Sequence, residues 1–260
     1  MRIRYTSLLA LCGALASCVA PSGQAAELKV LSAIGMRQVL LELGPRFERA
    51  TGHALAITFD STGVLQKRIA ADEPVDVVLL NQNAIDTLAG RRVISSVAPI
   101  ARSVAAVAIR KGTVRPDISS PEAFRRLLLS AASIARPSPS VGGSSGDHIV
   151  TVLNRLGITA EIDAKSVISL IGTGDQHADS PGDLVAKGKA EIALHQLQEL
   201  QAVAGVEVVG PFPGDLQGNF TFAAAIGTGS TQRDAAQALI AFLQTPQAAA
   251  VITAKGMALP

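Results

Sequence analysis

The stretch Leu28-Lys29-Val30-Leu31-Ser32-Ala33 decides the fold, because it is a short apolar strand that ends in a hydroxyl and a small side chain. An amphipathic helical pattern covers residues 36–50, Thr51-Gly52 stops it, and a second strand pattern covers residues 54–59. This order of strand, helix and strand builds parallel sheets that are covered by helices. The sequence therefore predicts an α/β protein.

The alternation of strands and helices continues along the chain. Further strands are predicted at residues 76–80, 104–109, 133–135, 167–171, 192–194, 206–209 and 220–226. Further helices are predicted at residues 64–71 and 85–88, from 121, after 146 through 156, and at 184–188, 234–243 and 247–255.

No internal repeat and no long linker interrupts this pattern, so we expect two lobes joined by crossing strands rather than two consecutive domains. The strands at residues 104–109 and 220–226 are the expected crossings. Lobe 1 is then residues 27–104 plus 221–260, and lobe 2 is residues 105–220.

Composition and charge exclude several classes of function. The 260 residues carry 23 Lys and Arg against 21 Asp and Glu, and Arg2 and Arg4 lie in the first 26 residues, so the rest of the chain is neutral. A neutral chain without basic runs does not favour nucleic acid or an anionic membrane as a partner. Hydrophobic residues make up 48% and charged residues 17%, which excludes a disordered protein.

Residues 1–26 are typical of a secretory signal peptide, with a positively charged start and an apolar run over residues 8–20 that is too short for a membrane anchor. Two processing routes stay open. Cleavage at Gly23-Gln24-Ala25 would release a soluble protein, whereas Leu15-Ala16-Ser17-Cys18 is similar to a bacterial lipobox and would leave Cys18 lipidated. Both routes predict an exported protein.

The cysteine and histidine content predicts neither a disulfide framework nor a metal site. Cys12 and Cys18 both lie in the leader, which leaves the rest of the chain without a cysteine cluster or a cysteine nucleophile. The four histidines show no spacing typical of metal ligands. No Walker loop or dinucleotide fingerprint is present, so we expect no cofactor.

Three places share one design, in which a strand is followed by hydroxyl or small residues and then by the start of a helix. They are Ser32-Ala33, Ser61-Thr62-Gly63 and Gly142-Gly143-Ser144-Ser145-Gly146. A helix start leaves backbone N–H groups without partners at the positive end of the helix dipole, which suits an anion without Lys or Arg. At any one of these places the hydroxyl could equally be a plain helix cap. Three in one α/β chain predict a shared anion site, because strand ends of this kind lie along one crevice.

His195 and Gln196 follow the apolar strand at residues 192–194, so both side chains are expected at the end of that strand. Two interpretations stay open for this pair. It is either a structural pair held by hydrogen bonds or part of a ligand site.

The glycine run also matches the Gly-x-Ser-x-Gly pattern of α/β-hydrolases, with Ser144 as nucleophile. Asp175 or Asp179, followed by His195, would complete the order of that triad. Against this alternative, Pro137 and neighbouring Pro139 interrupt the strand that would have to run directly into the serine.

These segments occur in the order seen in periplasmic molybdate-binding proteins, and the chain resembles that family over nearly its whole exported length. The matching segments are Leu31-Ser32-Ala33, Asp60-Ser61-Thr62-Gly63, Leu65-Gln66-Lys67-Arg68-Ile69, Val75-Asp76-Val77-Val78, the loop at 142–146 continuing to residues 153–158, and residues 184–192 and 210–217. They are specific for the superfamily of ABC-transporter substrate-binding proteins and less specific for molybdate.

The resemblance implies a two-lobe, type II binding-protein fold in which each lobe is a mixed, mostly parallel sheet flanked by helices. It implies a monomer that performs no chemistry, closes over a tetrahedral oxyanion such as molybdate or tungstate, and delivers it to an ABC permease in the inner membrane. By position, Ser32 and Ser61 match the two serines of the first lobe, with Ala33 and Thr62 beside them. Ser144 and Ser145 fall where backbone N–H groups of the second lobe contact the anion.

Two departures from the family pattern bear on the ligand. His195 falls near a position where the well-known members carry Tyr, and residues 172–182 do not match their pattern. A His and a Gln at the pocket suit a carboxylate or a protonated oxyanion at least as well as molybdate. A small carboxylate therefore stays open as the ligand.

Overall fold

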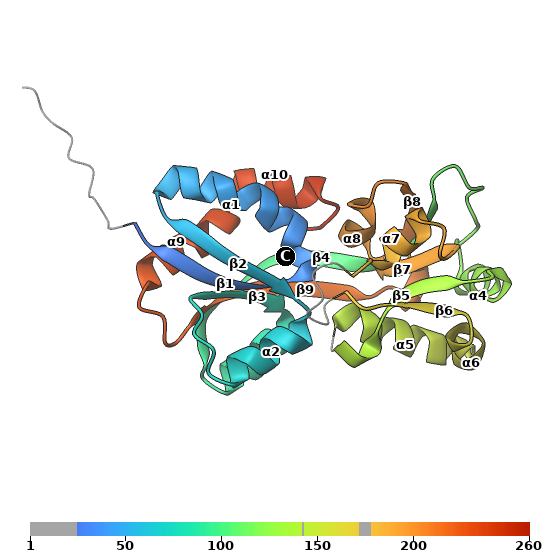
Figure 1. Cartoon of the computed structure of the whole chain (residues 1–260), viewed down its shortest axis with the longest axis horizontal. Helices are drawn as coiled ribbons and strands as arrows, with labels where there is room; N and C mark the ends of the chain where they lie inside the picture. Colours follow the sequence, from blue (N-terminus) through green and yellow to red (C-terminus); the bar gives the residue numbers. More distant parts are fainter. Residues whose placement is uncertain (1–24, 142, 172–177) are drawn as a thin grey trace, which may run out of the picture.

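The computed structural model describes residues 25–141, 143–171 and 178–260, and it confirms the predicted α/β fold class. Two bodies of strands and helices lie side by side, and strands β4 (Ile94–Arg110) and β9 (Asn219–Gly227) run between them (Figure 1). Nearly all of the predicted leader, including Cys18, lies outside the described residues, so its processing stays a prediction.

The strands follow the path β2-β1-β3-β9-β4-β7-β5-β6, with β8 paired to β4. Their bounds, besides those of β4 and β9, are β1 Glu27–Ala33, β2 Ala54–Asp60, β3 Val77–Asn81, β5 Ile134–Pro137, β6 Ser166–Ser169, β7 Ile192–Gln196 and β8 Val206–Pro211. The pairs β1–β2, β1–β3, β5–β6 and β5–β7 are parallel, whereas the pairs made by β4 and β9 are antiparallel. The antiparallel pairs therefore come from the strands that cross the molecule.

Helices cover the faces of the sheet. Their bounds are α1 Arg37–Thr51, α2 Thr62–Ala70, α3 Gln82–Gly90, α4 Pro121–Ser130, α5 Ser144–Leu156, α6 Thr159–Asp163, α7 Pro181–Ala186, α8 Leu197–Gln201, α9 Arg233–Leu243 and α10 Pro246–Ala254. Short 3-10 turns are η1 Ile34–Met36, η2 Pro139–Val141 and η3 Gly214–Leu216.

The first helix forms for the reason that its pattern predicted. Val39, Leu40, Leu43 and Phe47 make one buried stripe of α1, and burying such a stripe supplies most of a helix's stability in a protein. The helix ends at Gly52, whose φ of 76° is the left-handed conformation that glycine adopts without a steric penalty.

Strand β4 is longer than the sequence predicted, because only its second half was recognised. Its 17 residues pair with β9 from Ile94 to Val104 and with β7 and β8 from Ala105 onward. Pro99 hid the first half, since proline has no N–H to donate to a sheet, and the structure places an irregularity in the pairing beside it. We propose the boundary between lobe 1 and lobe 2 at this change of partners.

Two short helices, α6 and α8, were not predicted. Each has five residues, too few for a helical period to show in the sequence. Helix α8 packs against β4, β7 and β8, and the C-terminus lies near the middle of the molecule, where Ala258 pairs with Arg102 of β4 (Figure 1). The centre of the molecule therefore combines segments that are far apart in the sequence.

In the described part of the chain, no single helix has the length and hydropathy needed to cross a membrane. Helices α9 and α10 meet that test only as a pair, and the pair is bent by 60°.

Candidate functional site

A cavity between the two bodies of strands and helices collects most of the predicted site residues. It encloses about 430 Å³, part of which is open to solvent. The described residues that line it are Ala33, Ile34, Gly35, Ser61, Thr62, Pro137, Gly143, Ser144, Ser145, Ile171, His195, Gln196, Glu199 and Phe222. They come from both sides of the crossing strands, so a ligand in the cavity would touch both lobes.

The three predicted junctions between a strand and a helix meet at this cavity. The end of β1 contributes Ala33, the start of α2 contributes Ser61 and Thr62, and the start of α5 contributes Ser144 and Ser145. The first N–H groups of a helix lack partners within the helix and carry partial positive charge. The cavity thus gathers hydroxyl and backbone donors that could hold an anion.

Ser61 has a structural role as well as a place at the cavity. It is the N-cap of α2, and its hydroxyl accepts a hydrogen bond from the Val64 N–H at 3.3 Å. Its own N–H donates to Asp60 Oδ1 at 2.7 Å, and burial raises the pKa of the Asp60 carboxyl. The cap and the ligand interpretations are therefore compatible at this residue.

Close packing at Gly146 fixes the start of α5 against the end of the preceding strand. A Cβ on Gly146 would lie 3.0 Å from the Ser138 carbonyl oxygen and 3.2 Å from Pro139 Cα. Only glycine lets the helix approach that backbone, so the glycine run has a packing reason. The approach brings Ser144 and Ser145 to the same cavity as Pro137.

Ser32 is the one predicted ligand residue that the structure does not place at the cavity. Its side chain is fully buried in β1, and its hydroxyl donates to the Ala33 carbonyl oxygen at 3.1 Å. The neighbouring Ala33 lines the cavity instead. Seven of the eight predicted residues are thus brought together, and their role as ligand residues stays a proposal.

Gln196 is tied into a buried network that joins the two lobes. Its side-chain oxygen accepts from Gln198 Nε2 at 2.9 Å, and the same nitrogen donates to the Gly35 carbonyl oxygen at 3.1 Å. The Ser103 hydroxyl of β4 donates to the Gln198 side-chain oxygen. Because the Gln196 oxygen is engaged, its amide nitrogen is the end that remains to donate to a ligand.

His195 and Glu199 form a buried pair on the cavity wall. His195 Nδ1 lies 3.3 Å from Glu199 Oε1 and accepts a hydrogen bond from the Gln196 N–H at 2.8 Å. Burial lowers the pKa of His195 to about 4 and raises the pKa of Glu199 to about 8, the latter against the opposing charge of Arg37. At neutral pH both groups are therefore uncharged, and their contact is not an ion pair.

Glu199 is the main residue that the sequence did not predict at the site. It lies in the short helix α8, four residues after His195. Leu197 and Leu200 are spaced as on one helix face, and an acid between them is typical of a first helical turn. That signal follows a predicted site pair directly and could have identified the residue.

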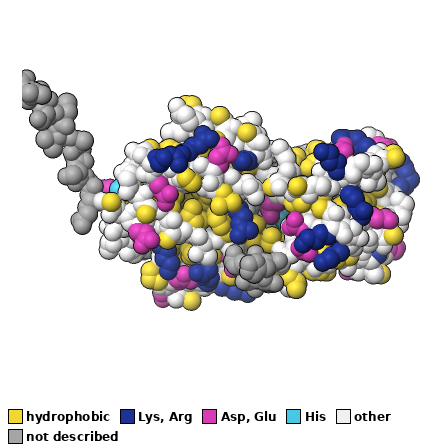
Figure 2. All heavy atoms as spheres, turned by 45° about the horizontal axis from the view of Figure 1, so that its top comes forward, with side chains coloured by type: hydrophobic (Ala, Val, Ile, Leu, Met, Phe, Trp, Pro, Cys, Tyr) yellow, Lys and Arg dark blue, Asp and Glu magenta, His cyan; other side chains and the backbone are white. Residues whose placement is uncertain are grey.

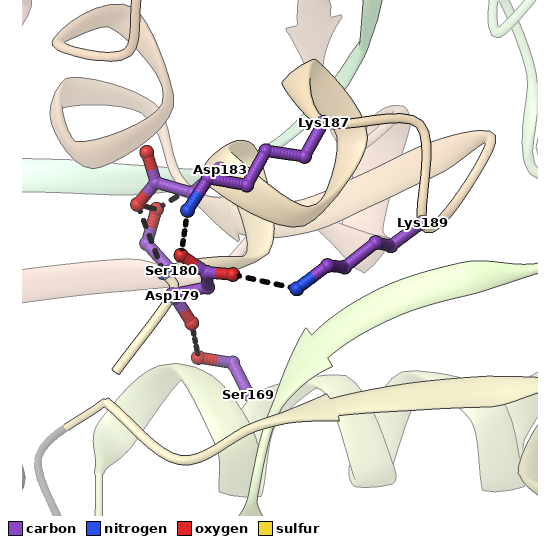
Figure 3. A network of polar contacts seen from close by, with 6 residues as sticks. All are labelled: Ser169, Asp179, Ser180, Asp183, Lys187 and Lys189. Carbon is purple, nitrogen blue, oxygen red and sulfur yellow. Dashed lines mark hydrogen bonds and ion pairs between the residues drawn. The ribbon is translucent and has the colours of Figure 1, made fainter. Parts of the chain in front are cut away.

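The described residues give the hydrolase alternative no triad. Strand β5 ends at Pro137 and a 3-10 turn follows, so no strand runs directly into Ser144. The Asp179 carboxylate forms ion pairs with Lys187 and Lys189 (Figure 3), and the acid found beside His195 is Glu199 instead. Asp175, the other predicted member, lies outside the described residues.

The same network anchors the chain where it returns to α7. Ser180 and Asp183 cap each other at the start of that helix, and the Ser169 hydroxyl donates to the Asp179 carbonyl oxygen at 2.6 Å (Figure 3). This fixes the end of β6 against α7. Ile171, two residues beyond Ser169, lines the cavity.

The charges at the cavity differ from those on the outer surface. Positive and negative side chains are interspersed on the face shown in Figure 2, and no large area of that face carries charges of only one sign. Among the described residues that line the cavity there is no Lys or Arg, and Glu199 is the one acid. In the described chain, no three His, Cys, Asp or Glu side chains are grouped so that they could hold a metal ion.

Comparison with known proteins agrees with this architecture. The model of the family described as bacterial extracellular solute-binding protein matches residues 28–258. An aconitate isomerase from a Pseudomonas species is 32% identical over 88% of this chain and 87% of its own. The molybdate-binding protein of Azotobacter vinelandii is 30% identical over 97% of this chain and 96% of its own.

Solved structures show the same fold. The periplasmic molybdate-binding protein of Azotobacter vinelandii superposes with a TM-score of 0.70 at 22% identity, covering 90% of this chain and 99% of its own. A sulfate-binding protein from Mycobacterium tuberculosis superposes with a TM-score of 0.67 at 16% identity, covering 89% of this chain and 86% of its own. The resemblance drawn from the sequence and the expected type II binding-protein fold are confirmed, and the chain belongs to the bacterial extracellular solute-binding protein family.

Proposed function

We propose that the protein is the periplasmic binding subunit of an ABC importer and that it carries a small anion in the cavity between its lobes. The observation that supports this most is the meeting of three strand-to-helix junctions at one cavity. In this function the protein performs no chemistry. The anion bridges the two lobes and shifts the population toward a closed form, which docks on the permease.

The donors at the cavity suit an oxyanion. Ser61, Thr62, Ser144 and Ser145 each carry a hydroxyl at the cavity wall, and the starts of α2 and α5 add backbone N–H groups. Neutral donors of this kind hold a charged oxygen without the salt bridge that a Lys or Arg would bring. Molybdate or tungstate remains the ligand that the family resemblance favours.

A small carboxylate is the alternative ligand, and the cavity gives it one specific argument. His195 places an imidazole near the position where the well-known members of the resembling family carry Tyr, and Glu199 adds a carboxyl group beside it. Both groups can donate or accept hydrogen bonds according to protonation. They suit a ligand that itself has ionisable oxygens.

A thermal-shift panel on the mature chain tests the proposal with molybdate, tungstate, sulfate, phosphate, citrate and aconitate. A ligand at 1,000 times its dissociation constant adds about 4 kcal/mol of stability, which corresponds to a rise of roughly 8–16 °C in Tm. A rise for molybdate and tungstate alone supports the oxyanion ligand. A rise for a carboxylate alone supports the alternative, and no rise for any anion contradicts the proposed function.

Replacing Ser61 with Ala is expected to weaken anion binding by the loss of one hydrogen bond to a charged group, on the order of 1.5–3 kcal/mol. Ser120→Ala is the matched control, because Ser120 also caps a helix through its hydroxyl but lies outside the cavity. Both variants lose a helix cap, but calorimetric titration should show a lower affinity for the anion only in Ser61→Ala. Equal affinities would make Ser61 a plain cap.

We propose a second candidate function, isomerisation of aconitate, because a relative of that name matches the chain and the cavity holds a titratable pair. An unsaturated carboxylate can isomerise when one allylic C–H bond breaks, the double bond shifts and a C–H bond forms at the far carbon. The step needs no oxidant, but it needs one group that takes a proton and one that gives a proton. Burial raises the pKa of Glu199 to about 8, so it holds a proton near neutral pH that it can give to the far carbon, and the neutral imidazole of His195 beside it can take the allylic proton.

Proton NMR of cis- and trans-aconitate incubated with the protein tests this second function. Conversion by the wild type, and a large loss of rate in Glu199→Gln, would support it. Conversion at the same rate in Glu199→Gln would show that Glu199 takes no part in the reaction. Absence of conversion by the wild type would leave the binding function as the only proposal.

A further inference from the structure

An acidic side chain is unexpected in a cavity built for an anion. Glu199 is the one acid among the described lining residues, and its side chain is only 13% exposed. An ionised carboxylate there would repel an anion held by the hydroxyls, and little water would screen the repulsion. The cavity can hold an anion well only if the negative charge of Glu199 is absent.

The geometry around His195 argues that it is absent. The Gln196 N–H donates to His195 Nδ1 at 2.8 Å, so this nitrogen presents its lone pair and the neutral ring carries its proton on Nε2. Glu199 Oε1 lies 3.3 Å from the same nitrogen. Two lone pairs at that distance repel each other, whereas a carboxylic acid O–H and a lone pair attract.

The other charged groups near Glu199 do not reverse the conclusion that Glu199 is uncharged. Arg37 of α1 lies along the groove beside the cavity and lowers the pKa of Glu199, but the effect of burial is larger. Asp183 of α7 lines the same groove, and its carboxylate accepts two hydrogen bonds within its own helix cap. Arg102 and Glu207, on the strands packed against α8, bind other groups.

We propose that Glu199 is a ligand-binding residue and that the cavity takes up an anion only while Glu199 carries its proton, so that one proton is held with each anion. This rests on the proposed anion-binding function of the cavity. A carboxylic acid adds an O–H donor to the hydroxyls around it, whereas a carboxylate can only accept. The sensitivity of anion binding to pH would then come from one side chain.

The proposal predicts the shape of the pH dependence. Burial raises the pKa of Glu199 to about 8, so affinity is expected to be constant below that value and to fall tenfold for each pH unit above it. Between pH 7 and pH 9 the dissociation constant should therefore rise about tenfold. His195, with a pKa of about 4, stays neutral throughout this interval.

Calorimetric titration at pH 7 and pH 9 tests this, with molybdate as the oxyanion probe and citrate as the carboxylate probe. Wild type should lose about tenfold in affinity, whereas Glu199→Gln, a neutral group of the same shape, should lose none. Glu161→Gln is the matched control, because Glu161 is exposed on α6 and should leave the wild-type pH dependence unchanged. An equal loss in wild type and Glu199→Gln would overturn the proposal.

Infrared spectroscopy of the ligand-free protein tests the protonation independently of binding. At pH 7 the spectrum of wild type minus that of Glu199→Gln should contain the carbonyl band of a protonated carboxylic acid. A carboxylate band in its place overturns the inference even if anions bind. If the protonated band is present but neither probe binds, the proposed function fails, whereas a carboxylate band together with anion binding means that only the proton coupling fails.

Discussion

Replacing Glu199 with Gln is expected to raise the free energy of unfolding at pH 9 by on the order of 3–5 kcal/mol and to leave it nearly unchanged at pH 5. The reason is the difference in proton affinity between the folded and unfolded chain. The pKa of Glu199 is about 8 in the folded protein against an ordinary value of 4.5. Each unit of that difference corresponds to about 1.36 kcal/mol.

The sign follows from which state holds the proton. Between pH 4.5 and pH 8 the folded protein binds a proton at Glu199 that the unfolded chain has released, so stability falls as pH rises. The loss is complete above the folded pKa, where the carboxylate is ionised and buried. Gln cannot ionise, so the variant avoids this loss at pH 9 and resembles the protonated wild type at pH 5.

Denaturant unfolding followed by circular dichroism at both pH values measures the effect. Trp fluorescence cannot be used, because the chain has no Trp. The pKa of His195, lowered to about 4, makes stability fall as the pH drops below 6.5, but both proteins retain this group and its effect largely cancels. A stability change of the same size at both pH values would contradict the raised pKa of Glu199.

Replacing Gly227 with Ala is expected to destabilise the fold by on the order of 3 kcal/mol or more. A Cβ at this last residue of β9 would overlap the carbonyl oxygen of Val75. That backbone has little freedom to move, since the Gly227 N–H donates to the Asp76 carbonyl at 3.0 Å and the Asp76 N–H donates to the Lys29 carbonyl at 2.9 Å. A methyl group here would force the backbone of β9 and the segment before β3 apart.

Gly229→Ala is the matched control for this substitution. Gly229 lies two residues further on, and nothing is found within 4 Å of a Cβ built there. Denaturant midpoints should fall for Gly227→Ala and stay close to wild type for Gly229→Ala. Similar midpoints for both variants would mean that the Val75 backbone gives way easily.

The sequence alone was sufficient for the α/β class, for most elements and for seven of the residues that line the cavity, out of eight predicted. These features are local, because each can be recognised within a short segment of the sequence. Examples are the apolar stripe of α1 and the hydroxyl of Ser61 at a helix start. Even the meeting of the three junctions followed from a general rule about strand ends. The family resemblance added the fold type, which the comparisons confirm.

What the sequence did not show depends on contacts between distant segments. The first half of β4 pairs with β9, more than a hundred residues away, and that pairing overrides the local effect of Pro99. Ser32 matched the family motif, yet its hydroxyl is satisfied inside the core while Ala33 lines the cavity. A motif defines which residues reach a junction, but only packing decides which of them faces the ligand.

Glu199 shows most clearly what cannot be predicted from the sequence alone. Its residue type and its place after His195 are visible in the sequence, but its protonation is not, because a pKa depends on how much water surrounds a group. The sequence determined the fold class and the convergence of neutral donors on one anion site. The tertiary structure alone decided that an acid lies buried among those donors and that its pKa is raised, because burial between two lobes is a property of the folded chain.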